Sequence, residues 1–255
     1  ELSPSNLTNL SSYSSKKKIG FMVSAFDIDS LNFILKLKTK FIKIPSGEIT
    51  NFPYLRVIGK ENRQIILSTG MSYLNEIDNA LKILYQSGQS QNKITILHCN
   101  SEYPTGYKDV NLLAMKTIKE KFKVKVGYSD HTLGHEVAIG AVSLGASIIE
   151  KHITLNNKLK GPDHLASLEP KEFINFVKSI RNIEKALGTK IKKPSKSESK
   201  NILFIRKVIV ASRKINKGKI IKENDLELKR AGKGIPASRI YKVIGLKANK
   251  NYKKD

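Results

Sequence analysis

The sequence contains no tryptophan and one cysteine among its 255 residues. No disulfide can form within a chain that has a single thiol, Cys99, so we predict a reducing, cytoplasmic compartment. Cys99 closes an apolar run over 94–99, which favours a buried structural thiol over a nucleophile. No apolar run approaches the ~20 residues that a membrane span requires, and no charged-then-apolar signal segment opens the chain. We therefore expect no membrane partner.

Acidic side chains are scarce. The chain has 22 of them against 46 lysines and arginines, which gives a net charge of +24 and a pI near 9.9. Such a charge is typical of proteins that bind nucleic acid or another polyanion, and this stays open as an alternative. The excess is mostly lysine spread along the chain, without a basic motif interleaved with aromatics. We favour a solvated lysine-rich surface without a nucleic-acid partner, whose basic rim attracts a small phosphorylated substrate.

Short apolar segments alternate with longer amphipathic ones. The β-type segments cover 19–26, 41–46, 64–69, 94–99, 124–130 and 147–154. The helical segments cover 28–37, 73–85, 110–120, 135–144 and 170–187. This alternation predicts a parallel α/β sheet, either open or closed into a (β/α)8 barrel. No Gly-x-Gly-x-x-Gly follows the first strand, which argues against a dinucleotide-binding fold.

Polar side chains follow every predicted strand. They are Ser24; Lys43, Ser46 and Glu48; Ser68 and Thr69; Ser101 and Tyr103; Ser129, Asp130 and His131; Glu150 and His152. The carboxyl ends of parallel strands meet at one rim, where barrel enzymes collect their catalytic groups. His131 and His152 end successive strands, so the leading hypothesis is a pair of ligands to a divalent metal ion. The alternative for either histidine is a hydrogen-bonded core residue.

The composition changes after residue 188. Residues 189–202 are rich in lysine and serine and include a proline, which is typical of an exposed linker. Residues 203–255 contain short strand-like pieces separated by turns. We predict a catalytic domain over 1–188, a linker over 189–202 and a small, mostly β module over 203–255.

Several spaced motifs together resemble the sialic acid synthase family, which includes legionaminic acid synthases. The motifs lie at 43–48, 66–71, 98–105, 126–132, 149–152 and 161–167. Residues 215–218 and 229–235 resemble the antifreeze-protein-like (SAF) domain found at the carboxyl end of that family. The resemblance covers nearly the whole chain and implies a TIM barrel followed by an SAF domain.

The family resemblance implies a transferase that condenses phosphoenolpyruvate with N-acetylmannosamine and water. Its products are N-acetylneuraminate and phosphate, released by C–O cleavage. The same motifs fit a legionaminic acid synthase that uses 2,4-diacetamido-2,4,6-trideoxy-mannose, so this alternative stays open. The resemblance also implies His131 and His152 as ligands of a Mn2+-type ion, with Mg2+ or Co2+ as alternatives. Imidazole nitrogen suits ions of the first transition row, and open coordination positions suit catalysis.

The resemblance assigns substrate-binding roles to further residues. The phosphoenolpyruvate ligands are Lys43, Ser46, Ser68 and Ser129, and Ser24 keeps a hydroxyl on the third barrel strand. The sugar contacts are Tyr103, Asp163 and Ser101.

One carboxylate and one arginine are further candidate residues of the site. Glu48 is the predicted carboxylate for proton transfer; its alternative is a structural ion pair with a rim lysine. Arg230 resembles a residue that reaches the partner subunit's site, which implies a domain-swapped homodimer.

Two motifs of the family are missing from the sequence. The first strand of the family carries Glu-Ile-Gly-x-Asn-His-Asn-Gly and the second carries Lys-Phe-Gln, and neither occurs here. We therefore expect a barrel that lacks its first two β/α units. An unclosed barrel exposes two sheet edges and lacks two strands of catalytic groups. On this basis we predict little synthase activity for the chain alone.

Overall fold

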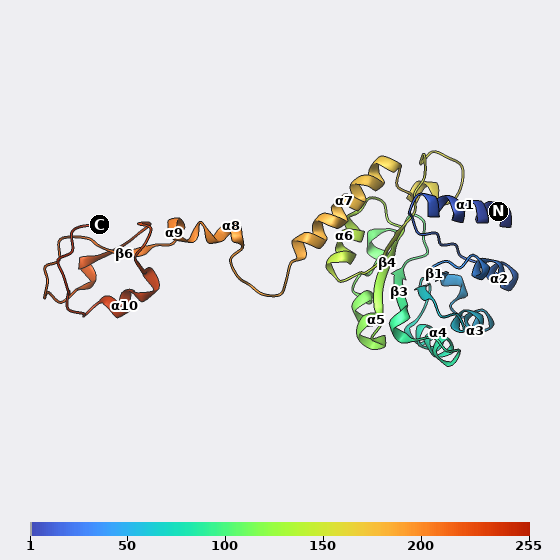
Figure 1. Ribbon diagram of the computed structural model, residues 1–255, viewed down its shortest axis with the longest axis horizontal. Coiled ribbons are helices and arrows are strands. Elements are labelled where there is room, and N and C mark those ends of the chain that lie inside the picture. The colour runs from blue at the N-terminus through green and yellow to red at the C-terminus, as the bar shows by residue number, and fades with distance from the viewer. Residues whose placement is uncertain (1) are drawn as a thin grey trace. The chain divides into compact units, whose positions relative to one another are not determined.

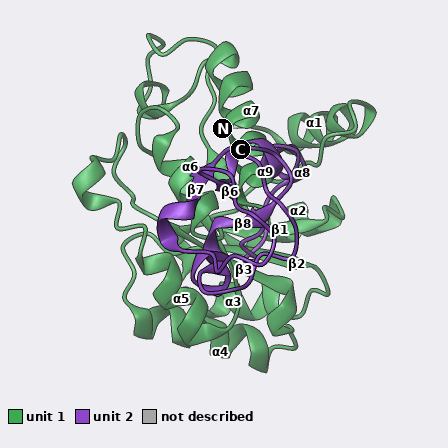
Figure 2. Cartoon of the chain, turned by 90° about the vertical axis from the view of Figure 1, so that its left-hand side faces the viewer, with its two compact units in different colours: residues 1–188 green, residues 189–255 purple. Residues whose placement is uncertain are grey.

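The computed structural model describes residues 2–255, and its elements follow one another as drawn in Figure 1. The contacts divide the chain after Gly188 into unit 1 (Glu1–Gly188) and unit 2 (Thr189–Asp255), which Figure 2 colours separately. Each unit has its own sheet and its own apolar core.

Unit 1 contains a five-stranded parallel sheet in the order β1-β2-β3-β4-β5. The strands are β1 (Phe41–Ile44), β2 (Gln64–Ser68), β3 (Ile94–Cys99), β4 (Lys125–Asp130) and β5 (Ile149–Lys151). The predicted fold class, a partial (β/α)8 barrel followed by a small β domain, is confirmed. The prediction of a sixth strand over 19–26 is wrong except for one parallel bridge between Ser24 and Lys43. This segment runs along the edge of the sheet, and its Ile19 and Phe26 are 67% and 69% exposed.

Helices precede, connect and follow the strands of unit 1 (Figure 1). They are α1 (Pro4–Lys16), α2 (Ile28–Lys36), α3 (Phe52–Gly59), α4 (Leu74–Gln86), α5 (Ala114–Phe122), α6 (Glu136–Ser143) and α7 (Pro170–Leu187). The predicted bounds of α7 are correct, since Pro170 occupies its first turn and Gly188 ends it with φ 56°. Helix α5 begins four residues later than predicted, because Asn111 has a left-handed φ of 49°.

The core of unit 1 lies between the sheet and these helices. Alternate residues of each strand face it: Ile42 and Ile44 on β1, and Ile65 and Leu67 on β2, are at most 2% exposed. The residue between the first pair, Lys43, points to the opposite face, as the period of two in a strand requires. One face of the sheet therefore packs the core, and the other carries polar side chains at its carboxyl end together with the buried Ile66 and Leu97.

Unit 2 contains a three-stranded antiparallel sheet in the order β7-β6-β8. Its strands are β6 (Val208–Ala211), β7 (Leu226–Lys229) and β8 (Ile235–Pro236), and its helices are α8 (Lys196–Ser199), α9 (Ile202–Ile205) and α10 (Ile240–Val243). Helix α8 lies in the segment predicted as a linker. The whole chain also has short 3-10 helices at Ser46–Glu48, Gln91–Lys93, Tyr107–Asp109, His164–Ala166, Glu223–Asp225 and Ala237–Arg239. Across residues 2–255, no helix combines the length and apolarity that crossing a membrane requires.

Candidate functional site

A cavity of about 460 Å3 opens at the carboxyl ends of the strands of unit 1. Its walls come from every strand end and from the 19–26 segment. They are formed by Ser24, Phe26, Lys43, Pro45, Ser46, Gly47, Ser68, Met71, Cys99, Ser101, Tyr103, Ser129, His131, Glu150 and His152. Nine of the twelve residues predicted as site residues lie on these walls.

An ion pair spans the concave face of the sheet. Lys43 belongs to β1 and Glu150 to β5, the first and last strands in the sheet order, yet their Nζ and Oε2 atoms are 3.4 Å apart. Ser129 Oγ donates to the other carboxylate oxygen, Oε1, at 2.6 Å. The sheet is thus curved enough for its two outer strands to meet through side chains. Lys43 is 8% exposed, so its ammonium is held at the cavity wall and largely shielded from water.

The rings of the two predicted metal ligands lie edge to face, beside an aromatic ring. The ring centroids of His131 and His152 are 5.3 Å apart, and Tyr103 lies 4.1 Å from His131 and 5.5 Å from His152. His131 Nδ1 lies 2.5 Å from the carbonyl oxygen of Asn100, so Nδ1 carries the proton and Nε2 keeps its lone pair. Burial, the largest cause, lowers the pKa of His131 and favours the neutral imidazole.

This histidine pair fits a transition-metal ion. A backbone carbonyl that accepts from one ring nitrogen orients a histidine ligand and fixes its tautomer, and His131 has this arrangement. His152 Nδ1 lies 3.8 Å from Asp163 Oδ2. In the part of the chain that the structure describes, no three His, Cys, Asp or Glu side chains gather as a metal site. An ion held by two imidazoles would take its other ligands from water or substrate oxygens.

Hydroxyl groups line the wall beside Lys43. Ser68 is 3% exposed, and its Oγ has no hydrogen-bond partner among the described residues. Ser46 Oγ accepts from Gly70 N at 2.9 Å. A side chain at position 70 would collide with Ser101, because a Cβ there would lie 2.2 Å from Ser101 Oγ. The glycine lets three strand ends bring their serines together, and a buried unpartnered hydroxyl is suited to an oxyanion.

Three predicted site residues lie away from the cavity walls. Glu48 Oε2 accepts from Asn51 Nδ2 at 2.6 Å at the start of α3, and its role in proton transfer stays a prediction. Asp163 is half-exposed beside His152. Arg230 is exposed in unit 2.

Sequence reasoning did not assign Glu150 a role, although it supplies the one carboxylate among the described cavity walls. A signal was available. Glu150 precedes His152 by two residues and therefore shares its face of the strand.

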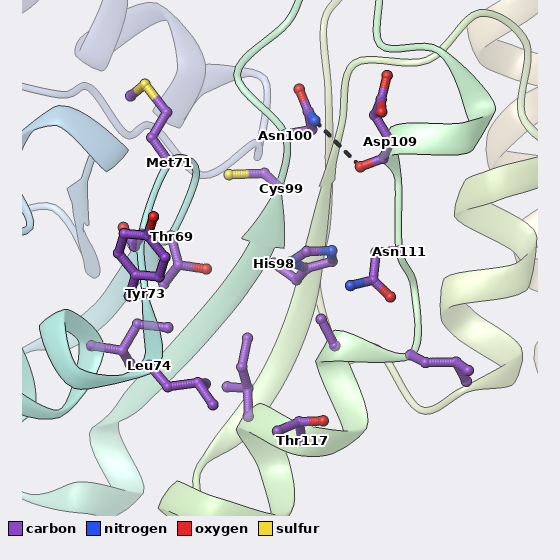
Figure 3. Close-up of a pocket in the computed structure, with 15 residues that line it drawn as sticks. Thr69, Met71, Tyr73, Leu74, His98, Cys99, Asn100, Asp109, Asn111 and Thr117 are labelled. Carbon is purple, nitrogen blue, oxygen red and sulfur yellow. Dashed lines mark hydrogen bonds between the residues drawn. The ribbon is translucent and has the colours of Figure 1, made fainter.

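A second cavity, of about 680 Å3, lies on the outer side of the sheet between α4 and α5 (Figure 3). His98 forms part of its wall, and its Nε2 lies 2.8 Å from the carbonyl oxygen of Val110. Burial lowers the pKa of His98. The adjacent Cys99 also lines the first cavity, so the two cavities lie on either side of the end of β3.

Residues 1–192 match the NeuB family, and residues 206–255 match the SAF domain. The chain is 50% identical over 243 residues to N,N'-diacetyllegionaminic acid synthase of Campylobacter jejuni, covering 95% of this chain and 73% of the relative. It is 43% identical over 253 residues to the synthase of the same name from Legionella pneumophila, covering 98% and 71%.

A solved structure of N-acetylneuraminic acid (sialic acid) synthetase from Leptospira borgpetersenii superposes with a TM-score of 0.73 at 36% identity. The match covers 79% of this chain and 70% of that one. Together these matches confirm the family resemblance that the sequence motifs indicated.

Proposed function

The chain belongs to the NeuB family, an enzyme family of sialic-acid-type synthases, and we propose that it joins phosphoenolpyruvate to an N-acylated hexose and releases phosphate. One observation carries the proposal. A shielded lysine, several short hydroxyls, a carboxylate and two imidazoles share the wall of one cavity at the carboxyl end of a barrel-type sheet.

Phosphoenolpyruvate brings a phosphate and a carboxylate on three carbons. Lys43 supplies a fixed positive charge, and Ser68 supplies a hydroxyl whose hydrogen-bonding capacity is unused. Ser46, Ser129 and Ser24 stand on the same walls. Charge-assisted hydrogen bonds of this kind are the stronger ones in proteins, and burial strengthens them further. We therefore assign the phosphoenolpyruvate subsite to the part of the cavity around Lys43.

The reaction requires two protons to move between defined atoms. C3 of phosphoenolpyruvate bonds to the aldehyde carbon of the open-chain sugar, and water adds at C2. The proton that this water loses goes to the former aldehyde oxygen. The C2–O bond to phosphate then breaks, and the proton of the new C2 hydroxyl leaves with phosphate. We assign the first transfer to Glu150, whose carboxylate Ser129 and Lys43 hold at the cavity wall.

The histidine pair and Tyr103 lie together on the walls of the same cavity. We infer that His131 and His152 hold a divalent ion, Mn2+ in our proposal, which when bound polarises the aldehyde oxygen as a Lewis acid. We assign the hydrogen bonds to sugar hydroxyls to Asp163, half-exposed beside His152, and to Ser101 on the cavity wall. The ring of Tyr103 lies against His131, which orients both rings toward the same space.

Among N-acylated hexoses, we propose 2,4-diacetamido-2,4,6-trideoxy-mannose as the acceptor. The two legionaminic acid synthases are 50% and 43% identical to the chain, whereas the N-acetylneuraminic acid synthetase is 36% identical. N-acetylmannosamine, the first choice in the sequence analysis, is the second candidate. The two sugars differ at C4 and C6, so the pocket has to discriminate an acetamido from a hydroxyl group.

Phosphate release with each sugar tests the acceptor. The assay uses phosphoenolpyruvate, Mn2+ and either sugar, with the 255-residue chain and with the protein expressed from its complete reading frame. We expect the higher kcat/KM with the diacetamido sugar. A higher value with N-acetylmannosamine would reverse the choice, and release with neither sugar in either protein would refute the proposed reaction.

Two matched variants test the assignment of the carboxylate. Glu150→Gln should lower kcat by about 10^2- to 10^4-fold, the usual worth of a general acid–base group. Glu48→Gln removes the same charge outside the cavity walls and should stay within about tenfold of the parent. The reverse ranking would give the proton transfer to Glu48. Thermal unfolding of both variants checks that each one folds.

We further propose a cytoplasmic homodimer in which Arg230 completes the site of the partner subunit. The single buried thiol, Cys99, suits a reducing compartment. Arg230→Ala and Lys43→Met subunits would each be inactive as homodimers. Mixed, they should recover part of the activity, because one of the two sites in a heterodimer then carries both intact residues. No recovery in a sample shown to contain heterodimers would contradict the exchange.

A further inference from the structure

A buried ion pair lies directly behind the two histidines. Lys151 Nζ is 3.0 Å from Asp130 Oδ2, and their side chains are 1% and 0% exposed. Asp130 and Lys151 are register partners at the end of β4 and β5. Their side chains leave the sheet on the face opposite to Ser129 and Glu150, the pair that lines the cavity. Neither Asp130 nor Lys151 forms part of the cavity wall.

The backbone pairing of the two strands stops at this ion pair. The last paired residues are Asp130 and Lys151, and His131 and His152 follow one position later. Each histidine carbonyl then accepts from a different loop: that of His131 from Thr105 N at 2.9 Å, and that of His152 from Leu168 N at 3.0 Å. Beyond the ladder, no backbone hydrogen bond between the described residues ties one histidine to the other.

Lys151 provides that missing link. Its ammonium donates to Asp130 and to the carbonyl oxygen of Thr132, the residues on either side of His131. Thr132 in turn donates to Asp130 Oδ1 from its backbone N at 3.0 Å and from Oγ1 at 2.7 Å. Lys151 therefore forms hydrogen bonds to both neighbours of His131 in the chain, and it is itself the residue before His152.

We propose that Asp130 and Lys151 are a positioning pair that fixes the separation of His131 and His152 for metal binding. The inference rests on the proposed metal site. A buried ion pair is weak evidence for stability, because apolar or neutral residues of the same shape often replace one without loss. Its position here, one residue before both ligands, suits a geometric role. Partners behind metal ligands typically change metal affinity by ~10- to 100-fold when removed.

The test measures Mn2+ binding from the EPR signal of the free ion in the 255-residue chain and its variants. Lys151→Met leaves Asp130 buried without its cation, so both stability and affinity should fall. The double variant Asp130→Asn with Lys151→Met is neutral and close in shape, so it should melt near the parent temperature. We still expect its Mn2+ affinity to fall by ~10- to 100-fold. Parent-like affinity in a folded double variant would overturn the proposal.

Arg63→Met is the matched control for general loosening. Arg63 pairs with Glu61 at 3.0 Å just before β2, and its side chain is 19% exposed, at the end of the sheet away from the histidines. The Arg63→Met variant should have a lower melting temperature and an unchanged Mn2+ affinity. An equal loss of affinity in Arg63→Met would also overturn the proposal. If the double variant does not fold, the Thr132→Val variant replaces it in the test. This variant keeps the ion pair but removes the hydrogen bond from Thr132 Oγ1 to Asp130. An unchanged Mn2+ affinity in this variant would refute the positioning role.

Crystal structures separate this proposal from the proposed metal chemistry. If the parent chain binds no Mn2+, the metal site is wrong, but the ring separation still tests the pair. In the double variant, the 5.3 Å between the centroids of His131 and His152 should change or become heterogeneous. An unchanged separation would refute the positioning role whether or not metal binds.

Discussion

The two units of the chain balance apolar burial and charge in opposite ways. Unit 1 has 25 basic and 17 acidic side chains over 1–188, a net charge of +8, around an apolar cluster that joins strands and helices. Unit 2 has 21 basic and 5 acidic side chains over 189–255, a net charge of +16, around a buried cluster of Ile215, Ile221 and Ala248. Two thirds of the excess charge thus belongs to the smaller unit.

One buried carboxylate gathers two of the cations of unit 2. Asp225 is fully buried and accepts from Arg213 Nε at 2.6 Å, Lys219 Nζ at 2.9 Å and Lys222 N at 2.9 Å. The Lys219 hydrogen bond, the largest cause, holds the pKa of Asp225 far below its usual range. In unit 1 the ion pairs Lys43–Glu150 and Asp130–Lys151 lie at or beside the site, whereas in unit 2 the buried Asp225 binds cations that belong to its fold. The comparison predicts different weak points in the two units.

The largest effect is expected from the core of unit 1. Leu67→Ala removes a fully buried side chain from β2 and should cost about 2–5 kcal/mol of unfolding free energy. The transition of unit 2 should not move. Denaturant unfolding followed by hydrogen exchange resolves the two units. Leu165→Ala, at a side chain that is 61% exposed, is the control and should stay within about 0.5 kcal/mol of the parent. An equal loss in both units would mean that they unfold together.

The second effect should be confined to unit 2. Asp225→Asn leaves Arg213 and Lys219 facing an uncharged amide, so β6 and β7 should lose hydrogen-exchange protection. The amides of β2 and β3 should keep theirs. Glu227→Gln, a half-exposed carboxylate on β7, serves as the control with little change. Unit 2 protection that survives Asp225→Asn would show that its small apolar core is sufficient.

As the pH falls, unit 1 should lose stability before unit 2. His98 has a pKa lowered by burial, so the unfolded chain takes up its proton first, and unit 1 loses stability as the pH falls below about 6.5. Asp225 has a lowered pKa, so its contribution is present above about pH 3.8 and is lost only below that value. Unfolding curves from pH 7 to 3 check the order. His98→Gln should reduce the loss in unit 1, and earlier acid unfolding of unit 2 would contradict the scheme.

Salt should have the smallest effect. Self-repulsion among the exposed cations of unit 2 is screened as ionic strength rises, since the Debye length falls from roughly 10 Å at 0.1 M to about 3 Å at 1 M. Sodium chloride should therefore stabilise unit 2 more than unit 1, by less than about 1 kcal/mol. Binding of the chain to duplex DNA, measured over the same range of sodium chloride concentrations, tests the polyanion alternative. Tight binding that weakens steeply with salt would support that alternative.

The sequence predicted best what local signals determine. Helix α7 has Pro170 in its first turn and Gly188 after its last, so both ends were readable. Helix α3 was missed, although Asn51 caps it and Pro53 stands in its first turn, because eight residues carry too little periodicity. The 19–26 segment is as apolar as a strand but forms only one bridge, from Ser24 to Lys43. Whether such a segment pairs fully depends on the strands beside it and not only on its own residues.

The site shows the same division. Strand-end position placed nine of the twelve predicted residues on the cavity walls. The pairing of Lys43 with Glu150 required the curvature of the whole sheet, which no motif states. The link from Lys151 to both flanks of His131 required the register of β4 against β5. Local spacing thus locates chemistry along each strand, while contacts between strands determine which groups act together.

The ion pair between Lys43 and Glu150 affects which ligands can bind in the cavity. An incoming anion has to compete for an ammonium that already has a carboxylate 3.4 Å away. A monocarboxylate such as pyruvate can form with Lys43 only the kind of ion pair that Glu150 already forms. A small molecule with a second anionic group can also use the free hydroxyl of Ser68. We therefore expect the cavity to favour small ligands with two anionic groups over monocarboxylates of similar size.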